Sequence, residues 1–243
     1  MKIVSNSDIQ SVGTVNKSID FGIDKKNIGI LFRGFSDTLY SNKIGSIVRE
    51  VTSNCFDSHR EAGVKDDVVI TMAPADPLTG KNGKISFQDV GVGLSPERIK
   101  DIYSKYFSST KRDTNDEIGG FGIGAKSPLA YTDVFEVNTI YGGIFYNYVV
   151  HRGEQVPVIK LLSQKKTDER NGTTVILPVR AGDEDRFRSE CKHQLRFFSN
   201  IHYIGLDIDR NYKVIEGKHW IASTNNDPDY RLSICLGGVS YPL

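Results

Sequence analysis

The chain has 243 residues, 38% of them hydrophobic and 25% charged, which is enough for one large domain with a substantial core. A formal net charge of +1 gives no general reason to expect a nucleic acid or an anionic membrane as partner. The three cysteines are few and far apart, so they indicate reduced thiols in a cytoplasm and neither a disulfide framework nor a zinc site. The N-terminus lacks an apolar signal core and no apolar run approaches a membrane span, so we expect no membrane segment.

The elements expected along the chain point to one fold class. Residues 1–36 are polar and glycine-spaced, and we expect an irregular segment or an N-terminal arm there. Apolar spacing and capping residues predict helices over residues 41–62, 95–106 and 183–199. Strand patterns occur at residues 67–73, 84–88, 134–140, 144–151, 156–162, 173–179 and 203–209. Because helices bracket a run of strands instead of alternating with them, the pattern favours an α+β fold or a mixed two-layer sandwich.

A polar stripe runs along the first predicted helix. Glu50, Asn54 and Asp57 fall within about 60° of one another at ~100° per residue, beside the apolar stripe and not opposite it. At the rim of a core face, Glu50 could act as a general base for water and Asn54 could offer an oxygen to Mg²⁺. For this helix alone, a surface helix with solvated acids is the commoner arrangement.

A second motif follows the strand predicted at residues 84–88. Asp89, Gly91 and Gly93 form D-x-G-x-G, which places a carboxylate beside a backbone that a flat ligand can approach closely. A carboxylate only accepts hydrogen bonds, so it suits an exocyclic amine such as that of adenine. In isolation the motif is also typical of a tight turn with an Asx-type cap.

The most unusual stretch is glycine-rich. Four glycines lie within residues 119–124, and Lys126 and Ser127 follow. Backbone N–H groups without side chains can cradle an anion, which suggests phosphate. However, Ala125 separates the last glycine from Lys126, as it does not in a Walker loop, and the dinucleotide fingerprint should follow a strand, whereas a polar loop precedes this stretch.

Taken in chain order, these motifs resemble those of the GHKL ATPase superfamily, which includes gyrase B, heat-shock protein 90, MutL and the sensor histidine kinases. The E-x-x-x-N-x-x-D pattern at 50–57 resembles its N box, D-x-G-x-G at 89–93 its G1 box, and GGFGIGAKS at 119–127 its G2 box with the end of the ATP lid. Gly172-Thr173-Thr174 resembles the G3 box, and the Ser-Thr-Lys ending at Lys111 is similar to a patch before the lid in the MutL branch.

Longer runs are similar to the N-terminal ATPase region of a phage family, the rapid-lysis proteins of the rIIA type. These runs are LYSNKIGSIVREVTSN, YFSSTK, NDEIGGFGIGAKSPLAYTDVF and GGVSYP. The resemblance covers about residue 40 to the end and weakens over residues 142–230. It implies a phage protein in the cytoplasm of an infected bacterium, either as an excised N-terminal domain or as a short relative.

The superfamily resemblance implies a Bergerat fold, a two-layer α/β sandwich with a mixed sheet and a mobile ATP lid. It places the ATP-binding domain at residues 37–210 and a C-terminal extension, or the start of a following domain, at 211–243. ATP and Mg²⁺ are the implied cofactors, with Glu50 polarising the attacking water and Asn54 ligating the metal. The implied nucleotide contacts are Asn54, Asp57, Asp89, Gly91, Gly93, Lys111, Gly119, Gly120, Phe121, Gly122, Ile123, Gly124, Lys126, Ser127, Thr173 and Thr174.

Individual roles follow from the same resemblance. Asp89 would take the adenine amine, with Thr173 or Thr174 supporting it through an ordered water. The glycines of the third motif would face the phosphates at the start of a helix near Lys126, whose ammonium would reach a phosphate or stay solvated. After Asp57 the sequence reads Ser58-His59, where Ala-His is usual in the rIIA-like pattern. We expect little consequence of this difference and a packed or surface role for the histidine.

Several functions remain open at this point. The first is a nucleotide-controlled conformational switch that binds ATP and ADP and hydrolyses ATP slowly, since the lysine that a following domain supplies in gyrase-like and MutL-like members cannot be identified. The second is a nucleotide-binding interaction module without turnover. A histidine-kinase-like transferase lacks a histidine before His59, and a DNA role has no support from net charge. Expected protein partners are a second copy, through the N-terminal arm or the lid, or another phage or host protein.

Overall fold

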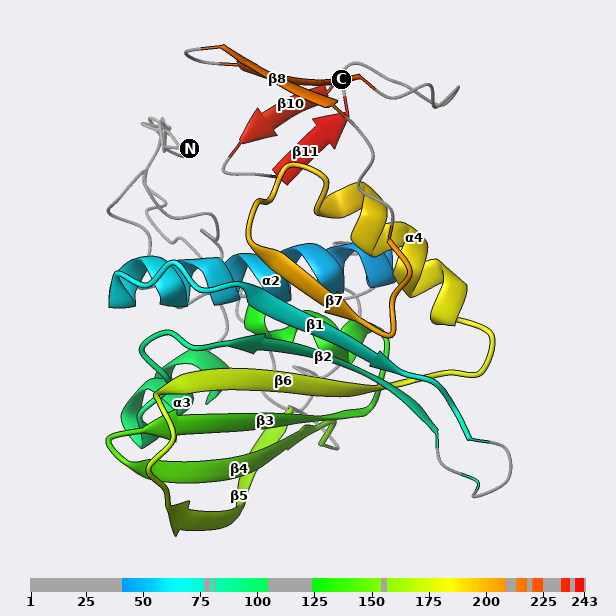
Figure 1. Cartoon of the computed structure of the whole chain (residues 1–243). Helices are drawn as coiled ribbons and strands as arrows, with labels where there is room; N and C mark the ends of the chain where they lie inside the picture. Colours follow the sequence, from blue (N-terminus) through cyan, green and yellow to red (C-terminus); the bar gives the residue numbers. More distant parts are fainter. Residues whose placement is uncertain are drawn as a thin grey trace, which may run out of the picture.

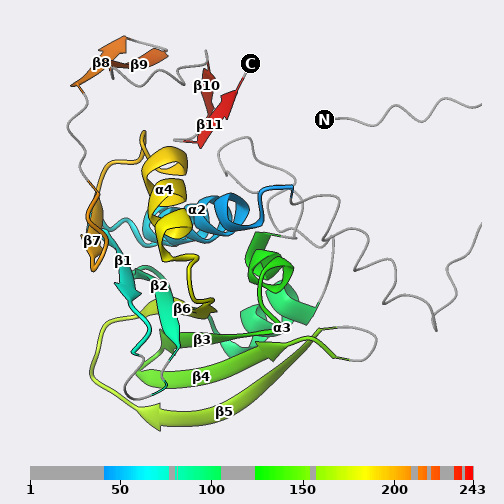
Figure 2. The same cartoon turned by 90° about the vertical axis from the view of Figure 1, so that its right-hand side faces the viewer.

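The computed structural model describes residues 41–76, 80, 82–104, 124–153 and 157–208, together with the backbone of four short strands between residues 213 and 242. Its centre is a seven-stranded sheet with helices packed on one face (Figures 1 and 2). The described helices are α2 (Lys43–Ala62), α3 (Pro96–Ser104), the short 3₁₀ helix η2 (Gly124–Ala130) and α4 (Glu184–Gln194).

The large sheet is mixed. Its strands are β1 (Val68–Ala73), β2 (Gly83–Asp89), β3 (Val134–Tyr141), β4 (Ile144–His151), β5 (Val158–Lys166), β6 (Gly172–Val179) and β7 (Ile201–Ile204). They lie in the order β5-β4-β3-β6-β2-β1-β7, and only β1 and β7 pair in parallel. The expected α+β class and mixed sheet are therefore confirmed. Two further hairpins are β8 (Lys213–Gly217) with β9 (Trp220–Thr224), and β10 (Ser233–Leu236) with β11 (Val239–Pro242).

Helix α2 begins and ends where local chemistry dictates. The side chain of Asn42 accepts a hydrogen bond from Gly45 N at 2.9 Å, which satisfies one of the free amides of the first turn. Gly63 adopts the left-handed conformation with φ 68° and donates its N–H to the carbonyl of Arg60, which ends the helix. The apolar stripe of the helix lies in the core as expected, with Ile47 and Val48 fully buried.

Three elements differ from their predicted bounds. Helix α4 ends at Gln194, before the predicted residue 199, although Leu195 and Phe198 remain buried. Strand β5 continues to Lys166 through polar residues, because an edge strand pairs through its backbone and needs no apolar alternation. The last predicted strand is displaced: β7 ends at Ile204, and Gly205 turns the chain at φ 68°.

Burial in the sheet gives a direct test of the core. Leu177 on β6 is completely buried, whereas Leu162 on the edge strand β5 is 60% exposed. Leu177→Ala should lower the free energy of unfolding by about 2–5 kcal/mol, because it removes buried methyl groups and leaves a cavity. The same change at Leu162 should cost less than about 0.5 kcal/mol. Denaturant unfolding measures both, and equal losses would show that β6 does not line the core.

Candidate functional site

The polar stripe of α2 lies between packed elements and is not a solvated surface. The Glu50 side chain is 26% exposed, and the Asp57 side chain is 11% exposed and ion-paired with Arg60 at 2.9 Å. Arg49 approaches Glu50 Oε1 at 3.3 Å. Asn54 is half-buried, and its side chain makes no hydrogen bond to another described residue. The arrangement that is commoner for such a helix, fully solvated acids on a surface, is therefore not the one found here.

The start of η2 lies directly against Glu50. A Cβ atom added at Gly124 would lie only 2.6 Å from Glu50 Oε2, so the backbone approaches the carboxylate more closely than any side chain would allow. Glycine is the residue that permits such an approach. Glu50 on the first helix and Gly124, the last glycine of the glycine-rich stretch, are 74 positions apart in the chain and are thus neighbours in space.

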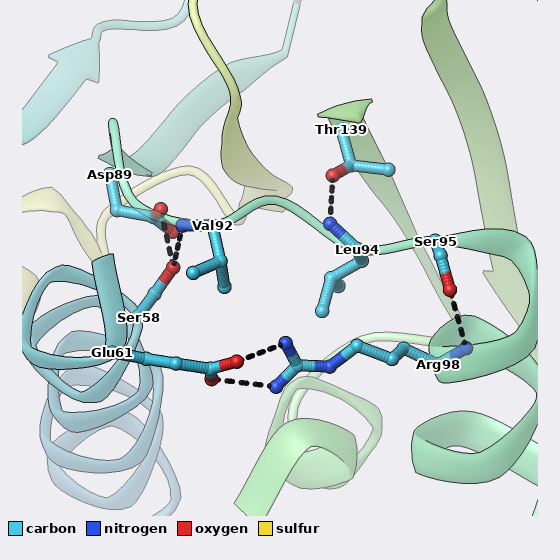
Figure 3. Close-up of polar contacts among 8 residues, drawn as sticks. All are labelled: Ser58, Glu61, Asp89, Val92, Leu94, Ser95, Arg98 and Thr139. Atoms are coloured by element: carbon cyan, nitrogen blue, oxygen red, sulfur yellow. Dashed lines mark hydrogen bonds and ion pairs between the residues drawn. The ribbon is translucent and has the colours of Figure 1, made fainter. Parts of the chain in front are cut away.

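Asp89 forms a second polar centre at the end of β2, and it is only 5% exposed. Its Oδ1 accepts hydrogen bonds from the Ser58 hydroxyl at 2.9 Å and from the Gly91 N–H at 2.8 Å. Val92 N–H in turn donates to Ser58 Oγ at 3.2 Å, and the Val90 N–H donates to His59 Nε2 at 3.0 Å (Figure 3 shows Ser58, Asp89 and Val92). Two consecutive residues of α2 therefore bind the whole turn after β2.

Burial raises the pKa of Asp89 from 3.8 to about 6, because desolvation penalises the charged form. The Gly91 amide, the Ser58 hydroxyl and the Thr173 amide act in the opposite direction and lower this pKa. Burial likewise lowers the pKa of His59, whose Nε2 accepts a hydrogen bond as only the neutral ring can. A buried carboxylate with a shifted pKa, next to half-buried polar groups, is typical of a functional site.

The glycines of D-x-G-x-G are required by contacts within the protein. A Cβ atom at Gly91 would lie 2.2 Å from Ser58 Oγ, and one at Gly93 would lie 2.0 Å from the carbonyl oxygen of Ile140. Gly93 also has φ +70°, which L side chains rarely adopt. The sequence left two reasons open for these glycines, a flat ligand and a tight turn with an Asx-type cap, and the Gly91 N–H bond to Asp89 with the close packing accounts for them as the turn.

The two threonines that follow Gly172 on strand β6 point to opposite faces of the sheet. Thr173 lies opposite Asp89 in the β2–β6 register, and its hydroxyl lies 3.2 Å from that of Thr139. Thr139, 1% exposed, also accepts the Leu94 N–H at 2.8 Å and donates to the Gly172 carbonyl at 3.0 Å. Successive strand side chains point to opposite faces, so Thr174 faces away from Asp89. Of the two threonines expected to support the carboxylate, the structure brings only Thr173 to it.

Two predicted phosphate contacts are buried. Lys126 is 4% exposed, and its ammonium donates to the Ile102 carbonyl at 2.6 Å. Burial lowers its pKa to about 8. Ser127 is fully buried, and its hydroxyl has no hydrogen-bond partner among the described residues. Both residues belong to η2, which is a seven-residue 3₁₀ helix and not the longer helix expected to begin near Lys126. Lys126 therefore joins η2 to α3 in this structure.

The remaining sequence candidates lie outside the described residues: Lys111, Gly119, Gly120, Phe121, Gly122 and Ile123. The predicted arm at residues 1–36 lies outside them too. From the sequence, little consequence was expected of Ser58 and no motif pointed to Thr139, whereas the structure bonds Ser58 to Asp89 and Thr139 to Leu94. Neither stands in a motif, because each hydroxyl acts on partners at least 31 positions away in the chain.

No group of three or more His, Cys, Asp or Glu side chains that could hold a metal ion occurs among the described residues. None of the described helices is long and apolar enough to cross a membrane. No protein-family model and no curated protein matches the chain. By its fold alone, the chain is an α+β protein with a seven-stranded mixed sheet.

The packing of Gly93 can be tested with a matched pair of glycines. Gly93 and Gly142 both have positive φ, but a Cβ atom at Gly142 would meet nothing within 4 Å. Gly142→Ala should therefore cost only the backbone strain of about 1–2 kcal/mol. Gly93→Ala should cost roughly 2–5 kcal/mol, because the clash with Ile140 adds to that strain. Thermal or denaturant unfolding compares the two variants, and losses of equal size would refute the close approach.

The raised pKa of Asp89 predicts a pH-dependent stability. The pKa of Asp89 is about 6 in the folded protein and 3.8 in the unfolded chain. The protonated carboxyl therefore adds to the free energy of unfolding in full below pH 3.8, and this contribution is lost as pH rises through about 6. In the Asp89→Asn variant the side chain at this position is uncharged at every pH. The free energy of unfolding of Asp89→Asn relative to wild type should therefore rise by about 2–3 kcal/mol from pH 4 to pH 7. A difference that stays constant across this range in the ligand-free protein would contradict the buried carboxylate.

Proposed function

We propose that this chain is a Mg²⁺-dependent ATP-binding domain of the GHKL type with a Bergerat fold, and that it hydrolyses ATP slowly. The observation that carries the proposal is the pairing of two polar centres along α2. Glu50 with Gly124 lies at one, and Asp89 with Thr173 at the other. Ser58, which binds Asp89, is eight residues beyond Glu50, about 12 Å along the helix axis. That separation suits an extended nucleotide with its base at Asp89 and its phosphates near Glu50.

The chemistry of each centre supports this orientation. The carboxylate of Asp89 accepts hydrogen bonds only, and its buried setting suits an exocyclic base amine. Glu50 is partly exposed, so a water molecule can reach it, and a general base needs such access. Under this proposal Asp57, bonded to Arg60, helps to shape the wall between the two centres.

The residues present suit Mg²⁺ bound largely through phosphates. Mg²⁺ in nucleotide sites takes one or two protein oxygens and keeps several waters, so it does not require a cluster of acids. The half-buried Asn54, whose amide has no partner among the described residues, would hold the ion. The ion would neutralise phosphate charge when bound. The chain's own contribution is to place an amide oxygen and the Glu50 carboxylate one helical turn apart.

A nucleotide-binding module without turnover is the alternative, and the structure gives one reason to consider it. Arg49 contacts Glu50 Oε1, and a guanidinium next to a carboxylate competes for the lone pairs with which a general base acts. The resemblance to rIIA-type phage proteins would place either version in the bacterial cytoplasm, with a second copy or another protein responding to the nucleotide.

Calorimetry with Mg·ATP, Mg·ADP and a non-hydrolysable analogue tests binding, and phosphate release tests turnover. Glu50→Gln should keep ATP affinity within a few-fold and lower the hydrolysis rate by about 10²-fold or more. Glu61→Gln is the control, because Glu61 lies on the same helix but pairs with Arg98 at 2.8 Å. Failure of all three ligands to bind the wild type would refute the proposal. Binding with equal hydrolysis rates in wild type and Glu50→Gln would select the module without turnover.

A further inference from the structure

The hydroxyl of Ser58 is fully engaged by the turn after β2. It donates to Asp89 Oδ1 at 2.9 Å and accepts the Val92 N–H at 3.2 Å (Figure 3). One side chain of α2 thus joins the carboxylate that begins the turn to the backbone three residues later. Because Ser58 belongs to a long, largely buried helix, the position of this hydroxyl is fixed by the core.

The neighbouring contacts leave the turn little freedom. His59 is 3% exposed and accepts the Val90 N–H at 3.0 Å, so it holds the residue next to Asp89. Beyond the turn, Arg98 of α3 makes two bonds to Glu61, at 2.8 and 2.9 Å. Ser58 is the member of this group that touches the Asp89 carboxylate itself.

The hydrogen bonds around Asp89 leave room for one ligand donor. An ionised carboxylate has about four acceptor positions. Ser58 and Gly91 occupy two on Oδ1, and the Thr173 amide also interacts with the carboxylate. About one position then remains, and the Ser58 bond helps to set the direction in which it points, because it restricts the rotation of the carboxylate together with the Gly91 amide.

We propose that Ser58 is a positioning residue that orients the Asp89 carboxylate toward a base with an exocyclic amine, so that the site distinguishes an amino-purine nucleotide from its oxo counterpart. This inference rests on the proposed nucleotide-binding function. It assigns a role to the residue that differs from the usual Ala-His of the rIIA-like pattern. Without the hydroxyl the carboxylate keeps the Gly91 and Thr173 amides but loses its only side-chain donor among the described residues, so its open acceptor position is held less firmly.

The protonation of Asp89 provides a readout that a purely structural role would not affect. The Ser58 hydroxyl lowers the pKa of Asp89, so its removal raises that pKa further above its usual range. A protonated carboxyl can donate to an oxo group and loses its preference for an amine. Among the described residues, Cys55 interacts electrostatically with Asp89 and His59 bonds to the adjacent Val90 N–H, and both are retained when Ser58 is changed.

The test compares Ser58→Ala with Ser53→Ala. Ser53 lies on the same helix and is also buried, but its hydroxyl has no hydrogen-bond partner among the described residues. Calorimetry gives the affinities for Mg·ATP and for inosine triphosphate with Mg²⁺, from pH 5.5 to pH 8. For Ser58→Ala we expect ATP affinity at pH 7 to fall about tenfold and the preference for ATP over inosine triphosphate to shrink by a similar factor. The pH midpoint of ATP binding should also rise, while Ser53→Ala should match the wild type.

Ser58→Cys serves as a second variant, since a thiol of similar size is a weak donor and should give intermediate values. If Ser58→Ala does not fold, the affinities of Ser58→Cys test the positioning role instead. If the wild type binds ATP but both Ser58 variants keep its base preference and pH midpoint, the positioning role is wrong and the nucleotide site stands. If the wild type binds neither nucleotide, the proposed function itself is refuted.

Discussion

The burial of one carboxylate, that of Asp89, constrains much of the surrounding structure. Removing an ionised carboxylate from water costs several kcal/mol unless hydrogen bonds replace those to water. Ser58, Gly91 and Thr173 supply these bonds from a helix, a turn and a neighbouring strand. The helix end must therefore contact the turn, and residue 91 must lack a side chain, since a Cβ atom there would overlap Ser58. One desolvated group thus fixes the relative positions of α2, β2 and β6.

The same helix transmits this constraint to the second polar centre. An α-helix rises about 1.5 Å per residue and is stiff, so the position of Ser58 sets that of Glu50 two turns earlier. Burial of Ile47, Val48 and Val51 against the sheet prevents the helix from sliding or rotating. The distance between Asp89 and Glu50 is therefore a property of the core, and it does not depend on a flexible loop.

How far the sequence predicted these features depends on the kind of signal. Regular apolar spacing predicted α2, β3, β4 and β6 within about two residues, because burial on one face leaves a periodic pattern. The polar half of β5 and the four short strands after residue 212 were missed, since backbone pairing alone leaves no such pattern. The motifs singled out Glu50 and Asp89, and the structure places each of them in a polar centre. Ser58 was expected to have little consequence, because a lone hydroxyl becomes informative only once its distant partner is known.

The two centres differ in rigidity, and the difference bears on the proposed chemistry. Asp89 is held by bonds of 2.8 and 2.9 Å in a buried setting, whereas Glu50 is partly exposed and, within the described part of the chain, contacts Arg49 at 3.3 Å through Oε1. If Glu50 activates water, Oε2 is the oxygen that remains for it. Oε2 is also the oxygen that faces Gly124, where any Cβ atom would lie 2.6 Å away. Only a residue without a side chain can therefore stand beside the oxygen of Glu50 that Arg49 does not contact.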